Sequence, residues 1–372
     1  MLDPDGFLPT DGEGPEKFTK TEQRWANNYE WLKTRGYLLR PRYAPNWVPS
    51  WKGEKKPKPS LFYEDGQMPF RSSIMDATRL SDNTYVILKL IQKSVHPYEV
   101  EIGQHLCSEA LAADPANHCV PTLDVLQLPD EEDLFILIIP LLRYYINPPF
   151  KTFGEAVECF RQLFEGLQFM HSHRVAHRDC MSLNIMMDAD LLYKGPFHPM
   201  QPVMRRDFKG YAKHYTRTQR PVKYLYIDFG ISRRYDPSEA KPTEIPIFGG
   251  DKRVPEFQNS NEPRDPFPTD VWYLGRAIQQ DFLLPRKGFE FMKELIDDMV
   301  QDDPAKRPSM DEVVSRYEVI SKGLSTWKLR SRVKSVNENS LTAIFRGVVH
   351  WSLHLQYLLR RLPAIPTYRP DV

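Results

Sequence analysis

Two polar strings, each placed directly after a short apolar segment, constrain this chain more than any other feature of its sequence. The first, residues 175–187 (Val-Ala-His-Arg-Asp-Cys-Met-Ser-Leu-Asn-Ile-Met-Met), carries Asp179 and Asn184 between two apolar stretches. The second, residues 224–230 (Tyr-Leu-Tyr-Ile-Asp-Phe-Gly), places Asp228 at the end of a predicted strand. Carboxylate and amide oxygens suit Mg²⁺, and a further carboxylate can orient or deprotonate a hydroxyl. The strings therefore predict phosphoryl transfer, which depends on positioning and cations rather than on covalent chemistry.

The period of the apolar residues divides the chain into a strand-rich first part and a helix-rich second part. Residues 84–91, 123–128 and 134–139 are β-branched and aliphatic runs that predict strands. A helical apolar stripe begins after Pro148, and helices are predicted again from Asp270 onward. We therefore expect an α+β fold with a smaller β-rich half and a larger helical half.

Composition excludes several classes of protein. Hydrophobic residues make up 41% of the 372 residues, which is enough for a sizeable core, and 50 basic residues are balanced by 49 acidic ones. This balance does not indicate a nucleic-acid partner. The four cysteines have no paired spacing, the first residues are acidic, and the longest apolar run, Leu134–Leu142, cannot cross a bilayer. We expect an intracellular, by default cytoplasmic, monomer without a membrane partner.

Taken together, the motifs resemble the signature set of the eukaryotic protein kinases. In that resemblance Asp179 stands at the catalytic-loop base, Asn184 at the second metal ligand and Asp228 at the Asp-Phe-Gly metal ligand. The string Val-Ile-Leu-Lys ending at Lys89 resembles Val-Ala-Ile-Lys, which implies that Lys89 contacts the α- and β-phosphates. Glu101 fits the helix glutamate that pairs with this lysine. The resemblance implies a bilobed kinase fold that uses ATP and Mg²⁺.

Three later motifs extend the resemblance over about residues 70–322. Glu256 closes Val-Pro-Glu, Asp270 opens Asp-Val-Trp-Tyr-Leu-Gly, and Arg307 lies in Asp-Pro-Ala-Lys-Arg-Pro. In the family the arginine of this last motif pairs with the glutamate of the Pro-Glu motif, so we expect an ion pair between Glu256 and Arg307. The string at residues 36–43 (Gly-Tyr-Leu-Leu-Arg-Pro-Arg-Tyr) and the long insertion between the two polar strings are similar to a fungal, kinase-like subgroup.

The chain departs from the family pattern at its nucleotide-binding motifs. No G-x-G-x-x-G precedes Lys89, where residues 70–79 read Phe-Arg-Ser-Ser-Ile-Met-Asp-Ala-Thr-Arg. The phosphate cradle is therefore missing or replaced by Ser72 and Ser73. Met181 stands where serine/threonine kinases carry a lysine. These departures leave a non-catalytic pseudokinase that acts as an interaction module as one alternative, and a small-molecule kinase as another.

Individual residues also keep alternative interpretations. Glu99 competes with Glu101 for the pairing with Lys89. Arg178 either binds a phosphate on the activation segment or is held by carboxylates. The candidate phosphate acceptors are Ser232, Tyr235, Ser238 and Thr243. A zinc site is disfavoured because its four possible ligands do not match a common zinc spacing; these are His171, His173, His177 and Cys180.

We expect four parts along the chain. Residues 1–58 form an extension with a disordered lead and a strap rich in aromatic residues and proline, and residues 59–142 form the N-lobe. Residues 143–325 form the C-lobe, in which the basic stretch 191–223 is interpreted as a solvated loop rather than a docking site. Residues 326–372 form an extension whose amphipathic helix packs on the larger lobe; binding to a membrane surface is the alternative.

These observations predict an ATP-dependent protein kinase. The expected reaction transfers the γ-phosphate to a protein hydroxyl, serine or threonine before tyrosine. Lys89 and Glu101 would hold the phosphates, Asn184 and Asp228 would bind Mg²⁺, and Asp179 would align the acceptor hydroxyl of a protein substrate.

Overall fold

Contacts within the computed structural model, which describes residues 16–69, 71–239, 241–246 and 253–369, divide the chain into two compact units. The first unit comprises Met1–Pro97, Pro121–Leu141 and Tyr193–His214, and the second comprises Tyr98–Val120, Leu142–Leu192 and Tyr215–Val372. The lead that the sequence predicts to be disordered lies almost entirely outside the described residues.

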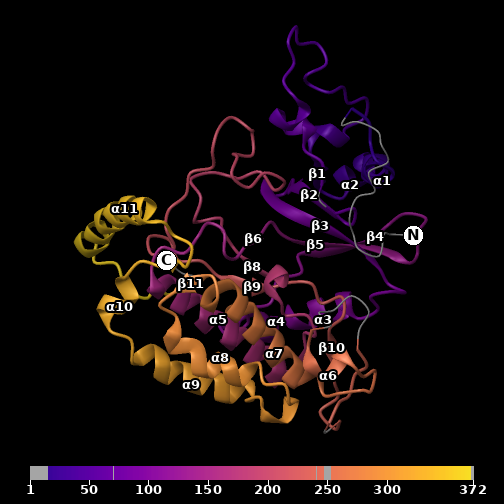
Figure 1. The fold of residues 1–372 in the computed structure, drawn as a ribbon. Coiled ribbons are helices and arrows are strands. Elements are labelled where there is room, and N and C mark those ends of the chain that lie inside the picture. Colours follow the sequence, from indigo (N-terminus) through magenta and orange to yellow (C-terminus); the bar gives the residue numbers. More distant parts are fainter. Residues whose placement is uncertain (1–15, 70, 240, 247–252, 370–372) are drawn as a thin grey trace. The chain divides into compact units, whose positions relative to one another are not determined.

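The first unit is built on an antiparallel sheet with the strand order β1-β2-β3-β5-β4 (Figure 1). Its strands are β1 Tyr37–Leu39, β2 Ile74–Arg79, β3 Thr84–Gln92, β4 Asp124–Gln127 and β5 Leu134–Pro140. The three strands predicted from the apolar runs are confirmed. Leu88 on β3 lies opposite Met75 on β2 and Ile138 on β5, so these side chains share one face of the sheet. All three are fully buried.

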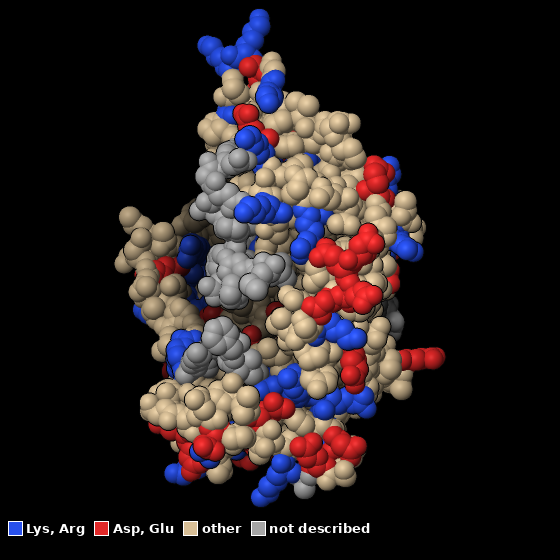
Figure 2. Space-filling model, turned by 90° about the vertical axis from the view of Figure 1, so that its right-hand side faces the viewer, with Lys and Arg blue, Asp and Glu red and all other residues tan. Residues whose placement is uncertain are grey.

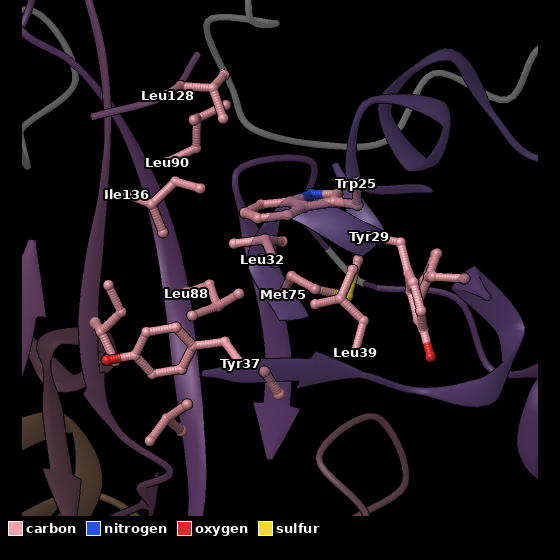
Figure 3. Close-up of a cluster of buried hydrophobic side chains, with 14 of the residues drawn as sticks. Trp25, Tyr29, Leu32, Tyr37, Leu39, Met75, Leu88, Leu90, Leu128 and Ile136 are labelled. Atoms are coloured by element: carbon pink, nitrogen blue, oxygen red, sulfur yellow. The ribbon is translucent and has the colours of Figure 1, made fainter. Parts of the chain in front are cut away.

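Two N-terminal helices, α1 (Lys20–Asn27) and α2 (Tyr29–Thr34), pack against this face. Figure 3 shows Trp25 and Leu32 of the helices beside Met75 and Leu88 of the sheet. The two helices are separated at Asn28, which is the C-cap residue of α1 and the N-cap residue of α2. Tyr43, from the predicted strap, is fully buried in the same cluster.

The second unit is mainly helical. Its helices are α3 Glu99–Leu106, α4 Glu109–Ala112, α5 Phe153–Ser172, α6 Pro255–Gln258, α7 Pro266–Ile278, α8 Lys293–Met299, α9 Met310–Lys322, α10 Thr326–Arg330 and α11 Ser340–Leu359. Its short strands are β6 Arg143–Tyr144, β7 Val175–Ala176, β8 Ile185–Met187, β9 Tyr224–Tyr226, β10 Arg233–Arg234, β11 Arg286–Lys287 and β12 Lys334–Ser335. The apolar stripe predicted for α5 is confirmed, since the apolar side chains of the helix from Phe153 to Met170 are buried in the core.

The central part of the basic stretch, residues 193–214, groups with the first unit. It is not a plain solvated loop. His198 is fully buried, and its Nε2 lies 3.2 Å from a carboxylate oxygen of Glu64. Arg206 forms a 2.6 Å ion pair with Asp76 on β2. Residues far apart in sequence make these contacts, so the local pattern of the insertion could not predict them.

The C-terminal helix α11 packs in a way that its sequence pattern does not predict. The pattern predicts that the apolar residues of the helix face the larger lobe. Instead His350, His354 and Tyr357 are the buried residues of the helix, whereas Leu341 and Phe345 remain 82% and 70% exposed. The helix therefore turns its polar stripe toward the second unit and its apolar stripe toward solvent.

Charge is mixed over the molecular face shown in Figure 2, where Lys and Arg side chains are interspersed with Asp and Glu. This matches the near balance of basic and acidic residues in the sequence. Among the described helices, none has both the length and the apolar character needed to cross a membrane.

Candidate active site

Asp270, a buried residue of α7, fixes the loop that carries the first polar string. Its two carboxylate oxygens accept the backbone N–H groups of His177 at 2.7 Å and of Arg178 at 2.6 Å. Arg178 has a φ of 68°, a left-handed conformation that a side chain other than glycine rarely adopts. The carboxylate of Asp270 thus offsets backbone strain directly before Asp179.

Asp179 and Asn184 are brought together at the end of this loop. The amide Nδ2 of Asn184 donates to the carbonyl of Asp179 at 2.9 Å and to its carboxylate at 2.8 Å. A 3-10 turn, Ser182–Asn184, shortens the path between them and leads into β8. With Nδ2 occupied in this way, the amide oxygen of Asn184 is oriented as a potential metal ligand.

Asp228 follows β9, which pairs with β8, so both strings end at one small sheet. Asp228 has a φ of 68°, and its carboxylate accepts the backbone N–H of Gly230 at 3.3 Å. The backbone N–H of Ile227 donates to the carbonyl of Asn184 at 3.0 Å, which ties the two strings together. Asp179, Asn184 and Asp228 are all partly exposed, so a ligand can reach them.

His177 links the two strings through its ring nitrogens. Its Nδ1 accepts the backbone N–H of Asp179 at 3.2 Å, and its Nε2 lies 3.1 Å from the carbonyl of Ile227. Because Nδ1 is an acceptor here, the ring is the neutral tautomer that donates from Nε2. Burial lowers the pKa of His177, although the carboxylates of Asp270 and Asp228 oppose this effect. A neutral, buried His177 is a positioning group rather than a proton carrier.

The donor set fits Mg²⁺ better than a metal held wholly by protein. Among the described residues no group of three or more His, Cys, Asp or Glu could hold a metal ion. Mg²⁺ usually takes only one or two carboxylates and completes its shell with water and phosphate oxygens. Asp228 and the amide oxygen of Asn184 match that pattern. His171, a candidate in the disfavoured zinc interpretation, contacts Asp270 at 3.1 Å.

The expected ion pair between Glu256 and Arg307 is confirmed. Arg307 donates from both terminal nitrogens to the two carboxylate oxygens of Glu256, at 2.8 and 2.7 Å. The side chain of Glu256 is 3% exposed and that of Arg307 is 0% exposed, so the pair is fully enclosed. The same carboxylate accepts the hydroxyl of Thr269 at 2.8 Å. This pair connects Glu256 on α6 with Arg307, which lies shortly before the start of α9.

Arg178 is held by a carboxylate rather than awaiting a phosphate. Its Nη2 lies 3.1 Å from the carboxylate of Glu244, and its guanidinium also donates to the carbonyls of Ile231 and Ile245. Among the four candidate acceptors, Ser232 and Tyr235 are buried, whereas Ser238 and Thr243 are exposed. Glu244 is therefore the carboxylate that contacts Arg178 in this structure.

Lys89 lies on the opposite face of the first unit's sheet from the apolar core. It is partly buried and opposes Ile74 on β2 and Leu137 on β5. Alternate residues of a strand share a face, as do directly opposed residues of neighbouring strands. Tyr85 and Asp76 therefore lie on the same face as Lys89.

A charged cluster occupies this lysine-bearing face. Asp76 is fully buried, and its carboxylate contacts Arg40 at 3.0 Å and Arg206 at 2.6 Å. Burial alone would raise the pKa of Asp76, but the two guanidinium groups more than offset this and hold it below its usual value. Arg206 also stacks over the ring of Tyr85. No local sequence pattern links the members of this cluster, so the sequence does not predict it.

The segment between β1 and β2, where a glycine-rich loop would lie, is long and has an ordered course over residues 40–69 and 71–73. Ser72, considered as a replacement for the glycines, is buried, and its carbonyl accepts the indole N–H of Trp25 at 3.1 Å. The carbonyl of Ser73 accepts the backbone N–H of Leu90. Ser72 is therefore enclosed within the first unit.

The two rival glutamates of α3 differ sharply in exposure. Glu99 is 1% exposed, whereas Glu101 points to solvent. The structure therefore separates the two glutamates by exposure alone, and the pairing of Glu101 with Lys89 stays a prediction.

Comparison with known proteins supports the kinase class without defining a subgroup. No family model matches the chain. It is 25% identical over 190 residues to the serine/threonine-protein kinase PLK4 of Drosophila virilis, and 23% identical over 251 residues to that of Aedes aegypti. These alignments cover 50% and 65% of the chain but only 23% and 31% of the relatives. The five-stranded sheet and the helical unit together have the two-part organisation of the protein-kinase fold.

Proposed function

We propose that the protein is an ATP-dependent kinase that phosphorylates serine or threonine hydroxyls of a protein substrate. Asp179 would accept the hydrogen bond of the acceptor hydroxyl and orient it, and Asn184 and Asp228 would bind Mg²⁺. The bound ion would neutralise charge that develops on the phosphates. The distant similarity to serine/threonine kinases supports this choice of acceptor.

One observation carries the proposal most strongly. The Nδ2 group of Asn184 is committed to Asp179, through bonds of 2.9 and 2.8 Å, while the backbone before Asp179 is held by buried Asp270. Holding two oxygen donors in fixed positions is what phosphoryl transfer requires of a protein. A loop kept only for folding would not need these polar groups near its surface.

We further propose that Lys89 and Glu101, the pair predicted from the sequence, serve the phosphates, with Glu99 as the rival of Glu101. Lys89 lies on the sheet face away from the apolar core, and both glutamates belong to α3. The enclosed pair Glu256–Arg307 supports a protein acceptor, because it organises the segment beside which kinases place peptide substrates. The small-molecule alternative has no comparable support.

A second candidate, a pseudokinase that does not turn over ATP, is favoured by a specific observation. The cluster of Asp76, Arg40 and Arg206 occupies the same sheet face as Lys89, and residues 40–73 replace the glycine loop. Without that loop the phosphates lose the close approach of backbone N–H groups. This candidate predicts binding of partners without phosphate transfer.

Incubation with labelled ATP and Mg²⁺, alone and with a generic protein acceptor, separates the two candidates. The kinase proposal expects transfer to serine or threonine that falls at least about a hundredfold in Asp179→Asn. The matched control is Asp302→Asn, which changes an exposed carboxylate of the same unit and should leave transfer unchanged. Transfer that survives in Asp179→Asn, or is absent from the wild type, contradicts the proposal.

A further inference from the structure

Helix α11 packs against the second unit with its polar stripe. Ala343, Gly347, His350, His354 and Tyr357 recur at three- and four-residue spacing, which places them on one face of a helix. Both histidines are 8% exposed and Tyr357 is 2% exposed. The hydroxyl of Tyr357 donates to the hydroxyl of Thr216 at 2.8 Å. This hydrogen bond helps to fix which face of α11 is turned outward.

The outward face carries large apolar side chains from the first turn of the helix to its last. Its residues include Leu341, Ile344, Phe345, Val348 and Leu359, which are between 66% and 82% exposed. A surface helix of a soluble protein normally shows the opposite arrangement, with its apolar stripe against the core. A continuous apolar patch of this kind marks an interaction surface.

Basic residues outnumber acidic ones in the segment that carries this apolar face. From Trp327 to Arg369 the only acidic residue is Glu338, whose carboxylate pairs with Arg332 at 2.7 Å and with Arg346 at 3.2 Å. The exposed basic residues of the segment are Lys334, Arg346, Arg360, Arg361 and Arg369. The surface therefore combines apolar side chains with an excess of positive charge.

A hollow beside α11 adds aromatic side chains to this charge. Trp327 of α10 and Trp351 of α11 line a cavity of about 640 Å³, together with Lys287 and Lys334. The two indole rings lie 5.7 Å apart and are 69% and 55% exposed. Figure 1 shows α10 and α11 next to each other in the second unit. Exposed tryptophan beside lysine and arginine is typical of a surface that contacts lipid headgroups.

We propose that the apolar face of α11, with its basic border, binds the surface of an anionic membrane. The helix would lie in the plane of the interface, its apolar side chains among the acyl chains and its arginines near the headgroups. Packing of the polar stripe on the second unit leaves the apolar stripe free for this orientation. The sequence pattern of α11 alone favours the absence of a membrane partner, because its helical stripe contains few basic residues. The basic residues of α10 and β12 lie outside that stripe and do not enter the pattern.

A second copy of the chain fits this surface less well than a membrane does. A helix of 20 residues is about 30 Å long and about 10 Å wide, so half its surface offers on the order of 500 Å². A stable interface takes about 800 Å² from each partner. Two copies would also bring their basic borders together, which is unfavourable.

Co-sedimentation of the full chain with lipid vesicles tests the proposal, which does not depend on kinase activity. We expect binding to phosphatidylcholine vesicles that contain phosphatidylserine, little binding to phosphatidylcholine alone, and weaker binding at high salt. The double variant Ile344→Glu, Phe345→Glu should abolish binding. Val319→Glu, on the exposed surface of α9, is the matched control and should bind like the wild type.

The basic border is tested separately. Arg360→Gln with Arg361→Gln should weaken binding to the anionic vesicles by about tenfold or more. Lys55→Gln with Lys56→Gln, exposed in the first unit, should have little effect. Unchanged melting curves establish that all variants fold. Equal binding to both vesicle types, no binding to either, or a dimer in sedimentation velocity that the Ile344, Phe345 variant dissociates would each overturn the proposal.

Discussion

The two units differ in how much of the kinase pattern they retain. In the second unit Asn184 directly precedes β8 and Asp228 follows its partner strand β9, Asn184 donates to Asp179, and buried Asp270 fixes the loop before Asp179. In the first unit Lys89 is present on β3, but the glycine loop is absent and a buried charge cluster shares its face. The difference indicates that the residues proposed to bind metal and acceptor are kept, whereas the glycine-rich loop is not.

The largest expected effect concerns the internal frame of the second unit. Arg307→Ala should lower the free energy of unfolding by about 3–5 kcal/mol, because Glu256 would remain buried without its bidentate partner. Arg316→Ala, whose side chain is 30% exposed among surface carboxylates, should cost less than about 1 kcal/mol. Chemical denaturation measures both. Equal stability of the two variants would show that the enclosed pair is not structural.

The corresponding test in the first unit is Asp76→Asn. The variant keeps the shape of the side chain but leaves Arg40 and Arg206 facing a neutral amide, so we expect a loss of about 3 kcal/mol in the free energy of unfolding. Asp82→Asn removes an exposed carboxylate of the same unit and should leave stability close to that of the wild type. A stable Asp76→Asn variant would mean that the cluster does not hold the sheet face together.

Arg206→Met asks whether the insertion is part of the first unit's structure. Asp76 would keep Arg40, so we expect a smaller loss of about 1–3 kcal/mol. Arg205→Met, at a neighbouring position with a 55% exposed side chain, is the control and should be close to neutral. If both variants unfold like the wild type, the insertion is only a solvated loop, as its sequence suggests.

The smallest effect is a pH dependence that His198 contributes. Burial lowers the pKa of His198, and Arg40 acts in the same direction while Glu64 opposes it. A lowered pKa means that the folded state resists protonation, so stability is complete above about pH 6.5 and falls as the pH decreases below that value. His198→Gln should make the melting temperature less sensitive to acid between about pH 7 and 5. His214→Gln, an exposed histidine of the same insertion, should not.

Local strings predicted the second unit better than the first. The helical stripe of α5 and the pair Glu256–Arg307 followed from residue spacing and family resemblance, and the structure contains both. The cluster around Asp76 could not be predicted, because its arginines come from a segment before β2 and from an insertion more than a hundred residues later. Patterns of neighbouring residues in the sequence do not show which charged residues from distant segments come into contact in a core.

Two further differences have the same origin. Glu101 fits the helix motif and Glu99 is its rival two residues earlier, and the sequence does not show that Glu99 is buried whereas Glu101 is exposed. The apolar residues of α11 predicted an amphipathic helix correctly, but a hydrophobic pattern does not say which stripe contacts the protein. The inward direction of His350 and His354 depends on their packing against the second unit, which periodicity alone does not encode.

Titration of the protein with ATP, with and without Mg²⁺, tests two features in one experiment. These are the proposed metal site of the second unit and the absence of a glycine-rich loop from the first unit. If the second unit keeps a working metal site while the first lacks a glycine loop, binding should be weak and strongly dependent on Mg²⁺. Lys89→Ala and Asp228→Asn should each remove it, whereas Ser72→Ala should leave affinity nearly unchanged because Ser72 is buried. The absence of detectable binding at millimolar ATP and Mg²⁺ would contradict the kinase proposal and favour the pseudokinase.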